Sequence, residues 1–477
     1  MTAFEIVQWF VYLLASMLFV RGLHDMNAPK TAVKGNHVSI VGMVIAVIMA
    51  FVGFFYDSES GSFGQDINWT ALVVVLVCVV VGAFLGARLA LRTKSTDYPQ
   101  LVSLFNTVGG GAAALVALND IMGASDSEVS LVLLITAGLG VIIGSVTFSG
   151  SLVAAGKLQR ILSGKPAKIP FKTFLTIVNI LAIIASFVML CVQPGCRTMW
   201  ALVALALSFI YGLLFVFPIG GADMPVVISV LNACTGTAVA MSGLALDNVA
   251  LIVAGALVGA SGMTLSVLMA KAMNRKLSAV LLGGFGGDNE AAAAGDGPEG
   301  TMKETTADDV AVQLKYAQRV IFVPGFGLAQ AQAQRDLADL GKLLEDKGVE
   351  VQYAIHPVAG RMPGHMNVLL AEANVPYEEL VDRDDINPQF PQADVALVVG
   401  ANDVTNPAAR KPGTPVSGMP ILDVDKAKRV VVIKRGRGTG YAGIQNELYF
   451  MDNTQMLFGD AKKELEEITA ALKELGD

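Results

Sequence analysis

The sequence is poor in charged residues, in histidine and in cysteine. Charged side chains make up 16% of the 477 residues, hydrophobic ones make up 53%, and the mean hydropathy is +0.57. A soluble globular chain carries about 25% charged residues, so most of this chain is expected to lie in lipid. The formal net charge of −7 shows no basic excess. This balance argues against nucleic acid as a partner, because binding it requires neutralisation of phosphates.

The four cysteines have no spacing that is typical of a zinc site. Cys78, Cys191, Cys196 and Cys234 lie in or beside apolar segments without paired Cys or His neighbours. We therefore expect no metal and favour free thiols, with a disulfide between Cys191 and Cys196 as the alternative. The first apolar run contains Glu5 and follows no basic stretch, so it is interpreted as a membrane span rather than a cleaved signal peptide.

Nine stretches are apolar and long enough to cross a membrane, which requires about 20 residues. Their predicted ranges are 4–22, 37–56, 70–91, 101–123, 131–153, 171–192, 200–217, 224–246 and 249–270. The fourth range is the weakest, because Asn106, Asn119 and Asp120 are costly to place in lipid.

Lysine and arginine are concentrated in alternate connections between these stretches. Cytoplasmic loops collect such residues. The basic set comprises Arg21, Lys30, Lys34, Arg88, Arg92, Lys94, Lys157, Arg160, Lys165, Lys168, Lys172, Lys271, Arg275 and Lys276. The opposite set holds only Arg197. A multi-pass protein of the inner (cytoplasmic) membrane is therefore predicted, with its N-terminus outside and its C-terminal domain in the cytoplasm.

Composition divides the chain into three parts. Residues 1–275 form a predicted polytopic α-helical membrane domain. Residues 276–312 are rich in Gly, Ala and acidic residues without apolar periodicity, which predicts a flexible linker. Residues 313–477 alternate helices with strands, and this pattern is typical of a Rossmann-like α/β domain with a doubly wound parallel sheet. The main strands are predicted at 319–324, 350–355, 394–399 and 429–434.

A Gly-x-Gly pattern stands where the first predicted strand meets a helix. Gly325 and Gly327 lie at this junction, where backbone N–H groups and a helix N-terminus can face a pyrophosphate. The third position of the usual fingerprint is Gln330 instead of Gly or Ala. A tight turn without a ligand is therefore the alternative.

The residues that distinguish NAD from NADP favour NADP. The second strand is followed by His356 and Pro357, so it lacks the carboxylate that would bind the ribose 2′-hydroxyl of NAD. Lys434 and Arg435 stand at the end of the strand 429–434 and are suited to a 2′-phosphate. A solvated basic strand end is the alternative.

Five motifs together resemble the NADP(H)-binding domain of the proton-translocating nicotinamide nucleotide transhydrogenases, which lies in their beta subunit. The motifs are 325–332, 356–373, 400–403, 434–435 and 440–443. The motif at 356–373 is the most specific, and the similarity runs from about 319 to 460. The resemblance implies an enzyme that couples hydride transfer between NADH and NADP⁺ to proton movement across the membrane.

The resemblance also implies which residues contact the nucleotide. They are Gly325, Phe326, Gly327, Val358, Ala359, Gly360, Arg361, Pro363, Gly400, Asn402, Asp403, Lys434, Arg435, Gly440, Tyr441 and Ala442. The loop 358–361 would lie against the pyrophosphate, the basic pair would hold the 2′-phosphate, and 440–442 would form a lid. Asn402 and Asp403 would lie near the nicotinamide, with Asp403 as a catalytic candidate. Capping by Asp403 and packing by Tyr441 are the alternatives.

Few groups in the predicted spans could move a proton. The run 220–225 is similar to the family's membrane motif, which implies that Asp223 and Asn232 lie on the proton route. Some family members carry His at the position of Asn106, and Asn does not take up a proton at physiological pH. His37 is therefore the best candidate carrier, because His titrates near neutrality. N-capping by Asp223 and an exposed loop position for His37 are the alternatives.

No second dinucleotide fingerprint precedes residue 319. The resemblance therefore implies an NAD(H)-binding alpha subunit as partner, and we expect an oligomer of this heteromer. The competing hypothesis is a channel or secondary transporter whose Rossmann domain senses nucleotide. It explains the architecture but not the match at 356–373. A reductase acting on quinone or haem would need paired His or Cys residues within the spans, which are not found.

Overall fold

The computed structural model describes most of the chain as two compact units, Met1–Ser266 and Val267–Asp477. The described residues are 2–26, 29–57, 62–63, 69–94, 97–123, 130–159, 161–163, 167, 169–220, 223–272, 276–281, 300–360, 364–412, 414, 416–440 and 442–476. Arg361, Pro363 and Tyr441, which the sequence assigns to the nucleotide site, lie outside them.

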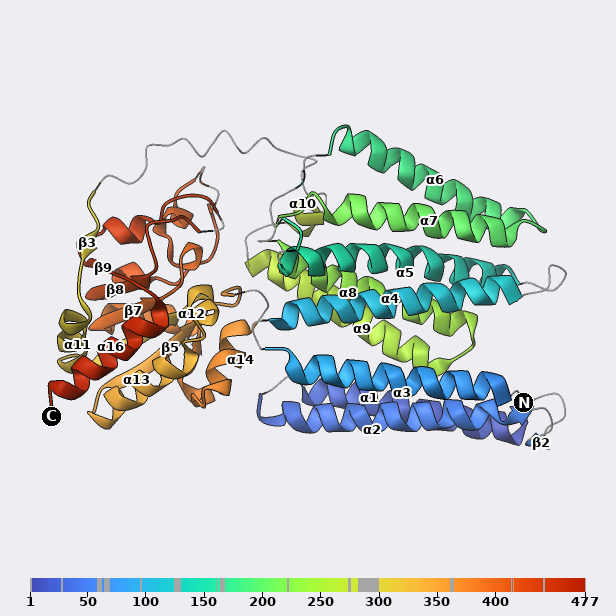
Figure 1. The fold of residues 1–477 in the computed structure, drawn as a ribbon, viewed down its shortest axis with the longest axis horizontal. Helices are drawn as coiled ribbons and strands as arrows, with labels where there is room; N and C mark the ends of the chain where they lie inside the picture. Colours follow the sequence, from blue (N-terminus) through green and yellow to red (C-terminus); the bar gives the residue numbers. More distant parts are fainter. Residues whose placement is uncertain are drawn as a thin grey trace. The chain divides into compact units, whose positions relative to one another are not determined.

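The predicted number of membrane spans is confirmed, because nine helices of the described chain are long and apolar enough to cross a membrane (Figure 1). They are α1 (Ala3–Asp25), α2 (Pro29–Phe54), α3 (Trp69–Arg92), α4 (Tyr98–Gly123), α5 (Leu131–Leu158), α6 (Lys172–Val192), α7 (Arg197–Val216), α8 (Met224–Ala245) and α9 (Val249–Ala272). Helix α2 begins before the predicted start at residue 37. His37 therefore lies within a helix, and the alternative of a loop position is wrong.

Helices α4, α5 and α8 form the interior of the first unit. In an apolar segment of 18 residues from each of these helices, 44%, 50% and 61% of the residues are buried, compared with 6% in α3. Glycine allows their backbones to approach closely: a Cβ on Gly110 of α4 would lie 3.0 Å from the carbonyl oxygen of Gly144 on α5. Between α2 and α3 lies a short antiparallel pair, β1 (Tyr56–Asp57) and β2 (Ser62–Phe63).

The second unit contains a seven-stranded parallel sheet. Its strands are β3 (Lys303–Glu304), β4 (Arg319–Pro324), β5 (Glu350–Ile355), β6 (Leu380–Asp382), β7 (Val395–Val399), β8 (Arg429–Lys434) and β9 (Thr454–Phe458). The order β3-β9-β8-β7-β4-β5-β6 includes the doubly wound order of dinucleotide-binding sheets, with β3 as an additional edge strand. The Rossmann-like fold is confirmed, and β4, β5, β7 and β8 are the four predicted strands.

Both faces of the sheet are covered, because side chains alternate along each strand. On β4, Val320 and Phe322 join the core beneath α13 (Gln334–Asp346) and α16 (Ala461–Glu474), whereas Ile321 and Val323 join the core on the other face. Helices α13 and α16 pack against each other (Figure 1). The helices of this unit are α10 (Leu277–Leu281), α11 (Ala307–Lys315), α12 (Phe326–Ala331), α13 (Gln334–Asp346), α14 (His365–Glu372), α15 (Arg383–Ile386) and α16 (Ala461–Glu474).

The sheet domain begins on the N-terminal side of residue 313. Within the interval predicted to be a linker, β3 pairs with β9, and α11 buries Val310 and Ala311 completely. The sequence did not reveal these elements because β3 has two residues and α11 has nine, which is too short for clear periodicity. The extent of the linker stays a prediction, since residues 282–299 lie outside the described part.

Candidate functional site

The strand order reverses between β4 and β7, and the loops that follow these two strands meet there. In doubly wound sheets the crevice at this switch point binds the ligand. The N–H of Gly325 donates to the carbonyl oxygen of Val399 at 2.9 Å, and that of Gly327 donates to Gly400 at 2.9 Å. The predicted Gly-x-Gly motif and the Gly400 motif are thus joined through their backbones.

Side chains would not fit where these two loops touch. A Cβ on Gly327 would lie 2.6 Å from the Cα of Gly400, and one on Gly325 would lie 2.5 Å from the backbone nitrogen of Ala401. Gly400 itself has a φ of +68°, a left-handed conformation that glycine favours. The glycines therefore leave bare backbone at the switch point, which is the condition for close approach of a dinucleotide.

The loop after β5 is held by the imidazole of His356, which is 1% exposed. Its Nε2 lies 2.7 Å from the carbonyl oxygen of Pro420, and its Nδ1 accepts the N–H of Val358 at 3.3 Å. The N–H of Ala359 donates to the carbonyl oxygen of His356 at 3.0 Å. Burial lowers the pKa of His356 to about 4, so the ring is neutral at pH 7 and donates from Nε2. His356 thus shapes the turn that includes Val358, Ala359 and Gly360.

Asp403 joins the loop after β7 to the loop 440–442. Its carboxylate Oδ2 accepts the N–H of Ala442 at 3.0 Å. Gly440 packs against the same carboxylate, since a Cβ there would lie 2.7 Å from Asp403 Oδ2. The carbonyl oxygen of Asn402 accepts from Asn446 Nδ2 at 2.9 Å. The structure therefore brings together the described residues of the predicted motifs 325–332, 400–403 and 440–443.

Lys434 is the last residue of β8, beside β7, and Arg435 follows it directly. The ammonium of Lys434 donates to the carbonyl oxygen of Gly438 and lies 5.0 Å from the centre of the Tyr449 ring. Burial lowers the pKa of Lys434, and the charge of Asp403 partly offsets this shift. The side chain of Arg435 is 54% exposed, with its Nε 3.7 Å from Asp460 Oδ2. Both cations thus stand at the carboxyl edge of the sheet.

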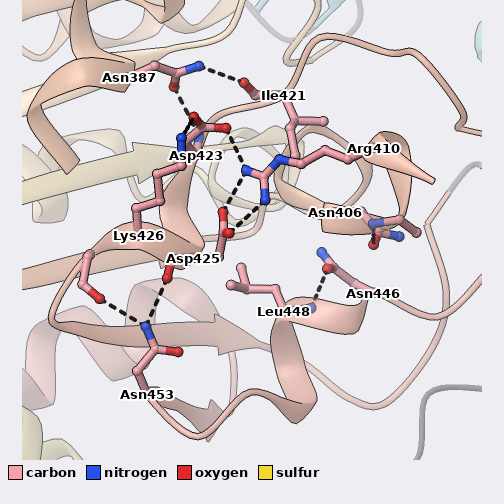
Figure 2. Close-up of polar contacts among 12 residues, drawn as sticks. Asn387, Asn406, Arg410, Ile421, Asp423, Asp425, Lys426, Asn446, Leu448 and Asn453 are labelled. Carbon is pink, nitrogen blue, oxygen red and sulfur yellow. Dashed lines mark hydrogen bonds and ion pairs between the residues drawn. The ribbon is translucent and has the colours of Figure 1, made fainter. Parts of the chain in front are cut away.

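Sequence reasoning missed a polar network that supports the segment 402–428. Figure 2 shows Arg410 between Asp423 and Asp425, with closest distances of 2.6 Å and 2.7 Å. The side chain of Asn387 accepts the N–H of Asp423 at 3.0 Å and donates to the carbonyl oxygen of Ile421 at 3.0 Å. No local pattern marks these residues as partners, because they come from separate loops.

Two buried asparagines fix the turns around Asn402. Asn446 Nδ2 also donates to Thr405 Oγ1 at 3.2 Å, while its Oδ1 accepts the N–H of Leu448. Asn406 Oδ1 accepts the N–H of Glu447 at 3.2 Å. Asn406 is followed by Pro407, a turn signal that indicated the loop but not its partner.

The candidate proton-route residues occupy different places in the first unit. Asn106 is buried, and its Nδ2 donates to the carbonyl oxygen of Ile228 on α8 at 3.4 Å. Asp223 holds the N-cap position of α8 without a side-chain capping hydrogen bond, and Asn232 is half-buried on that helix. His37 is exposed on α2. All four cysteines are free thiols.

Comparison with known proteins covers nearly the whole chain. A family model described as NAD(P) transhydrogenase beta subunit matches residues 8–471. Two proteins named NAD(P) transhydrogenase subunit beta, from Rhodospirillum rubrum and from one of its strains, are each 45% identical over 469 residues, which cover 97% of this chain and 98% of theirs. The match spans both the nine long apolar helices and the parallel sheet of the described chain, and the chain therefore belongs to the NAD(P) transhydrogenase beta-subunit family.

Proposed function

We propose that this multi-pass membrane subunit binds NADP(H) at the carboxyl edge of its sheet and thereby couples hydride transfer to proton movement. Its family makes it part of an enzyme that uses nicotinamide nucleotides and that has an alpha subunit. The choice of NADP(H) rests on one observation. Lys434 ends β8 and Arg435 follows it, while β5 is followed by a histidine turn without a carboxylate.

The residues present fit a dinucleotide that carries an extra phosphate. The bare backbone at Gly325 and Gly327 can approach a pyrophosphate closely. A pyrophosphate is also stabilised near the N-terminus of a helix, because that end of the helix dipole is positive. The turn at Val358–Gly360 supplies further backbone, held by His356. Lys434 now donates to a neutral carbonyl oxygen, and a phosphate would be a stronger, charged acceptor.

Strand order supports one direction for the nucleotide. β8 and β5 lie on opposite sides of the switch point between β7 and β4. A usual Rossmann site binds the adenosine ribose beside the strand that corresponds to β5. A 2′-phosphate held by the basic pair at β8 would instead place the adenosine on the other side. The loop 440–442, fastened to Asp403 through Ala442, would then cover the bound nucleotide as a lid.

In this proposal the residues of the protein bind the nucleotide, orient it and shield it from water. The nicotinamide, when bound, supplies the hydride. Lys434 and Arg435 neutralise the 2′-phosphate, the glycine loops hold the pyrophosphate through backbone N–H groups, and Asp403 keeps the lid closed against water. Asn402 and Asp403 lie toward the nicotinamide, where NADH held by the alpha subunit would be presented. An oligomer of the heteromer is part of this proposal.

Proton movement would give the near-thermoneutral hydride exchange its direction. One charge crossing 100 mV contributes about 2.3 kcal/mol, which shifts an equilibrium about 50-fold. We assign the route to Asp223, Asn232 and Asn106, with His37 as carrier because an amide does not take up a proton. The alternating basic connections support a topology with the N-terminus outside and the sheet domain in the cytoplasm.

Calorimetry on the complete complex tests the nucleotide proposal. NADPH is expected to bind far more tightly than NADH, and Lys434→Ala with Arg435→Ala is expected to lose about 1.5 to 3 kcal/mol per charged contact. The control is Lys462→Ala with Lys463→Ala, because these lysines form ion pairs with Glu466 and Glu467 along α16. Equal affinities for both nucleotides would remove the case for NADP(H). Unchanged affinity in the first double variant would place the 2′-phosphate elsewhere.

A further inference from the structure

Lys157 is a buried lysine in the last turn of α5. Within the described part of the chain, its ammonium donates hydrogen bonds to backbone carbonyl oxygens only. Lys157 is 4% exposed. Its Nζ donates to the carbonyl oxygens of Phe217 at 2.5 Å, Ile219 at 2.8 Å and Val216 at 3.4 Å. An ammonium has three N–H donors and no acceptor. Three acceptors therefore match its whole donor capacity.

The three carbonyl oxygens belong to the end of α7 and the turn after it. Val216 is the last residue of α7. The last carbonyls of a helix lack intrahelical partners and carry the negative end of the helix dipole. The oxygen of Phe217 also accepts the N–H of Ala167 at 3.1 Å. A lysine from one helix thus closes the C-terminus of another, and a cation suits that position.

Close packing of α5 on α7 directs Lys157 to this place. A Cβ on Gly212 of α7 would lie 2.5 Å from the carbonyl oxygen of Val146, and one on Gly150 of α5 would lie 3.1 Å from Val216 Cγ2. Positions 150 and 157 are two helical turns apart and so share one face of α5. Lys157 continues the small-residue face where α7 ends, and its long side chain reaches around that end.

The segment held by Lys157 leads directly to Asp223. Ile219 is 2% exposed, and its N–H donates to the carbonyl oxygen of Val216 at 3.1 Å. The N–H of Asp223 donates to Gly220 at 3.2 Å, and α8 follows with the fully buried Met224. Helix α8 also carries the carbonyl oxygen that Asn106 contacts. The anchor at 216–219 thus sets where the chain enters α8.

We propose that Lys157 is a positioning residue for proton translocation, which holds the end of α7 and so orients Asp223 and the start of α8. This inference rests on the proposed proton route through Asp223 and Asn232. Lys157 neither carries the translocated proton nor contacts nucleotide. Its fixed charge keeps the turn before α8 in one geometry while protons pass.

The test compares variants of the complete alpha–beta complex in sealed vesicles. Lys157→Met keeps the length of the side chain and removes all three donors, whereas Lys157→Arg keeps charge and donors. Lys271→Met is the matched control, because Lys271 also lies in the last turn of a spanning helix but is exposed. Proton uptake is followed with an acid-sensitive dye during hydride transfer from NADPH to NAD⁺.

A second assay isolates hydride transfer from proton movement. NADH reduces NADP⁺ that stays bound, and the NADPH formed reduces an oxidised NAD analogue, so hydride is relayed without net proton translocation. Lys157→Met should lower proton uptake at least about tenfold, since charged hydrogen bonds of this kind are lost, and should leave the relay intact. Lys157→Arg should retain most of the uptake, and Lys271→Met should match the unmodified complex.

Normal proton uptake in Lys157→Met would overturn the inference, as would a parallel fall of uptake and relay, which marks a purely structural role. If Lys157→Met does not assemble, Lys157→Gln is judged by the same two assays. Asp223→Asn distinguishes a failure of the proposed proton route from a failure of the role assigned to Lys157. If it pumps normally, the proposed route fails. If it fails to pump while Lys157→Met pumps normally, only the role of Lys157 is wrong.

Discussion

The ring of His356 makes two backbone contacts, of which one needs a proton on Nε2 and the other needs Nδ1 without a proton. The two together require the neutral ring. Nε2 faces the carbonyl oxygen of Pro420, and Nδ1 accepts the N–H of Val358. A proton on Nδ1 would abolish the second contact and place a charge in a site that is 1% exposed. Burial accordingly lowers the pKa to about 4, so His356 links loop geometry to stability.

This link predicts a pH dependence of unfolding. Between pH 6.5 and about 4 the unfolded chain binds a proton at His356 and the folded domain does not, so stability falls as the pH falls through this window. The expected loss is about 3 kcal/mol by the low-pH end. Urea unfolding of the isolated sheet domain at pH 7.5 and 4.5 measures it, with His356→Asn as comparison.

The change in stability with pH is compared between the unmodified domain and His356→Asn. The difference between them is the contribution of His356. Asp394 and Asp423, whose pKa values are lowered by their cationic neighbours and hydrogen bonds, also cost stability in acid. They contribute equally to both proteins and cancel in the comparison. The same pH slope in the unmodified domain and in His356→Asn would show that His356 is not the group responsible.

At the scale of elements, α11 and β3 complete the sheet domain from its N-terminal side. Val310, Ala311 and Leu314 are fully buried, and the N–H of Thr305 donates to Met456 at 3.0 Å. Thr306 caps α11 by accepting the N–H of Asp309 at 3.2 Å. These contacts belong to one cooperative core.

A fragment of residues 300–477 should therefore be more stable than one of residues 313–477. Burial of a Val or Leu side chain contributes about 1.5 to 3 kcal/mol, so a difference of about 3 kcal/mol or more is expected in urea unfolding. Val310→Ala should reproduce part of this loss, and Val312→Ala, at a position 42% exposed on the same helix, should not. Matching midpoints for the two fragments would contradict this role of α11.

At the scale of the whole molecule, the proposed function assigns nucleotide binding and proton movement to different units of the chain. If His37 carries the proton, His37→Ala should leave NADP(H) affinity unchanged and abolish proton uptake by vesicles that contain the complete complex. His24→Ala is the matched control, since His24 is an exposed histidine on the neighbouring helix α1. Normal acidification by His37→Ala would eliminate His37 as an obligatory carrier.

Asn106→His sharpens this test. The amide of Asn106 donates to Ile228 on α8, so an imidazole there would stand beside α8 and could titrate near neutrality. We expect it to restore proton uptake in the His37→Ala background. A double variant that stays inactive would show that a histidine at position 106 does not replace His37 as a proton carrier.

Much of the architecture followed from local patterns in the sequence. Length and hydropathy located the nine spans, and apolar runs located β4, β5, β7 and β8, because each of these signals lies within one short segment. The motif residues of the proposed nucleotide site could also be assigned to one edge of the sheet, since they follow strand ends that converge there. The start of α2 was misplaced because its first turns are polar.

Only the tertiary structure decided which distant groups meet. Arg410 pairs with two aspartates from another loop, and Lys157 reaches carbonyl oxygens about 60 positions away. Backbone carbonyls carry no sequence signal, and a lysine near a helix end reads only as a basic loop residue. The sequence by itself determined the spans, the four main strands and the family, because these depend on local periodicity and on motifs. The partners of buried polar groups were decided by packing, which alone brings their few acceptors within reach.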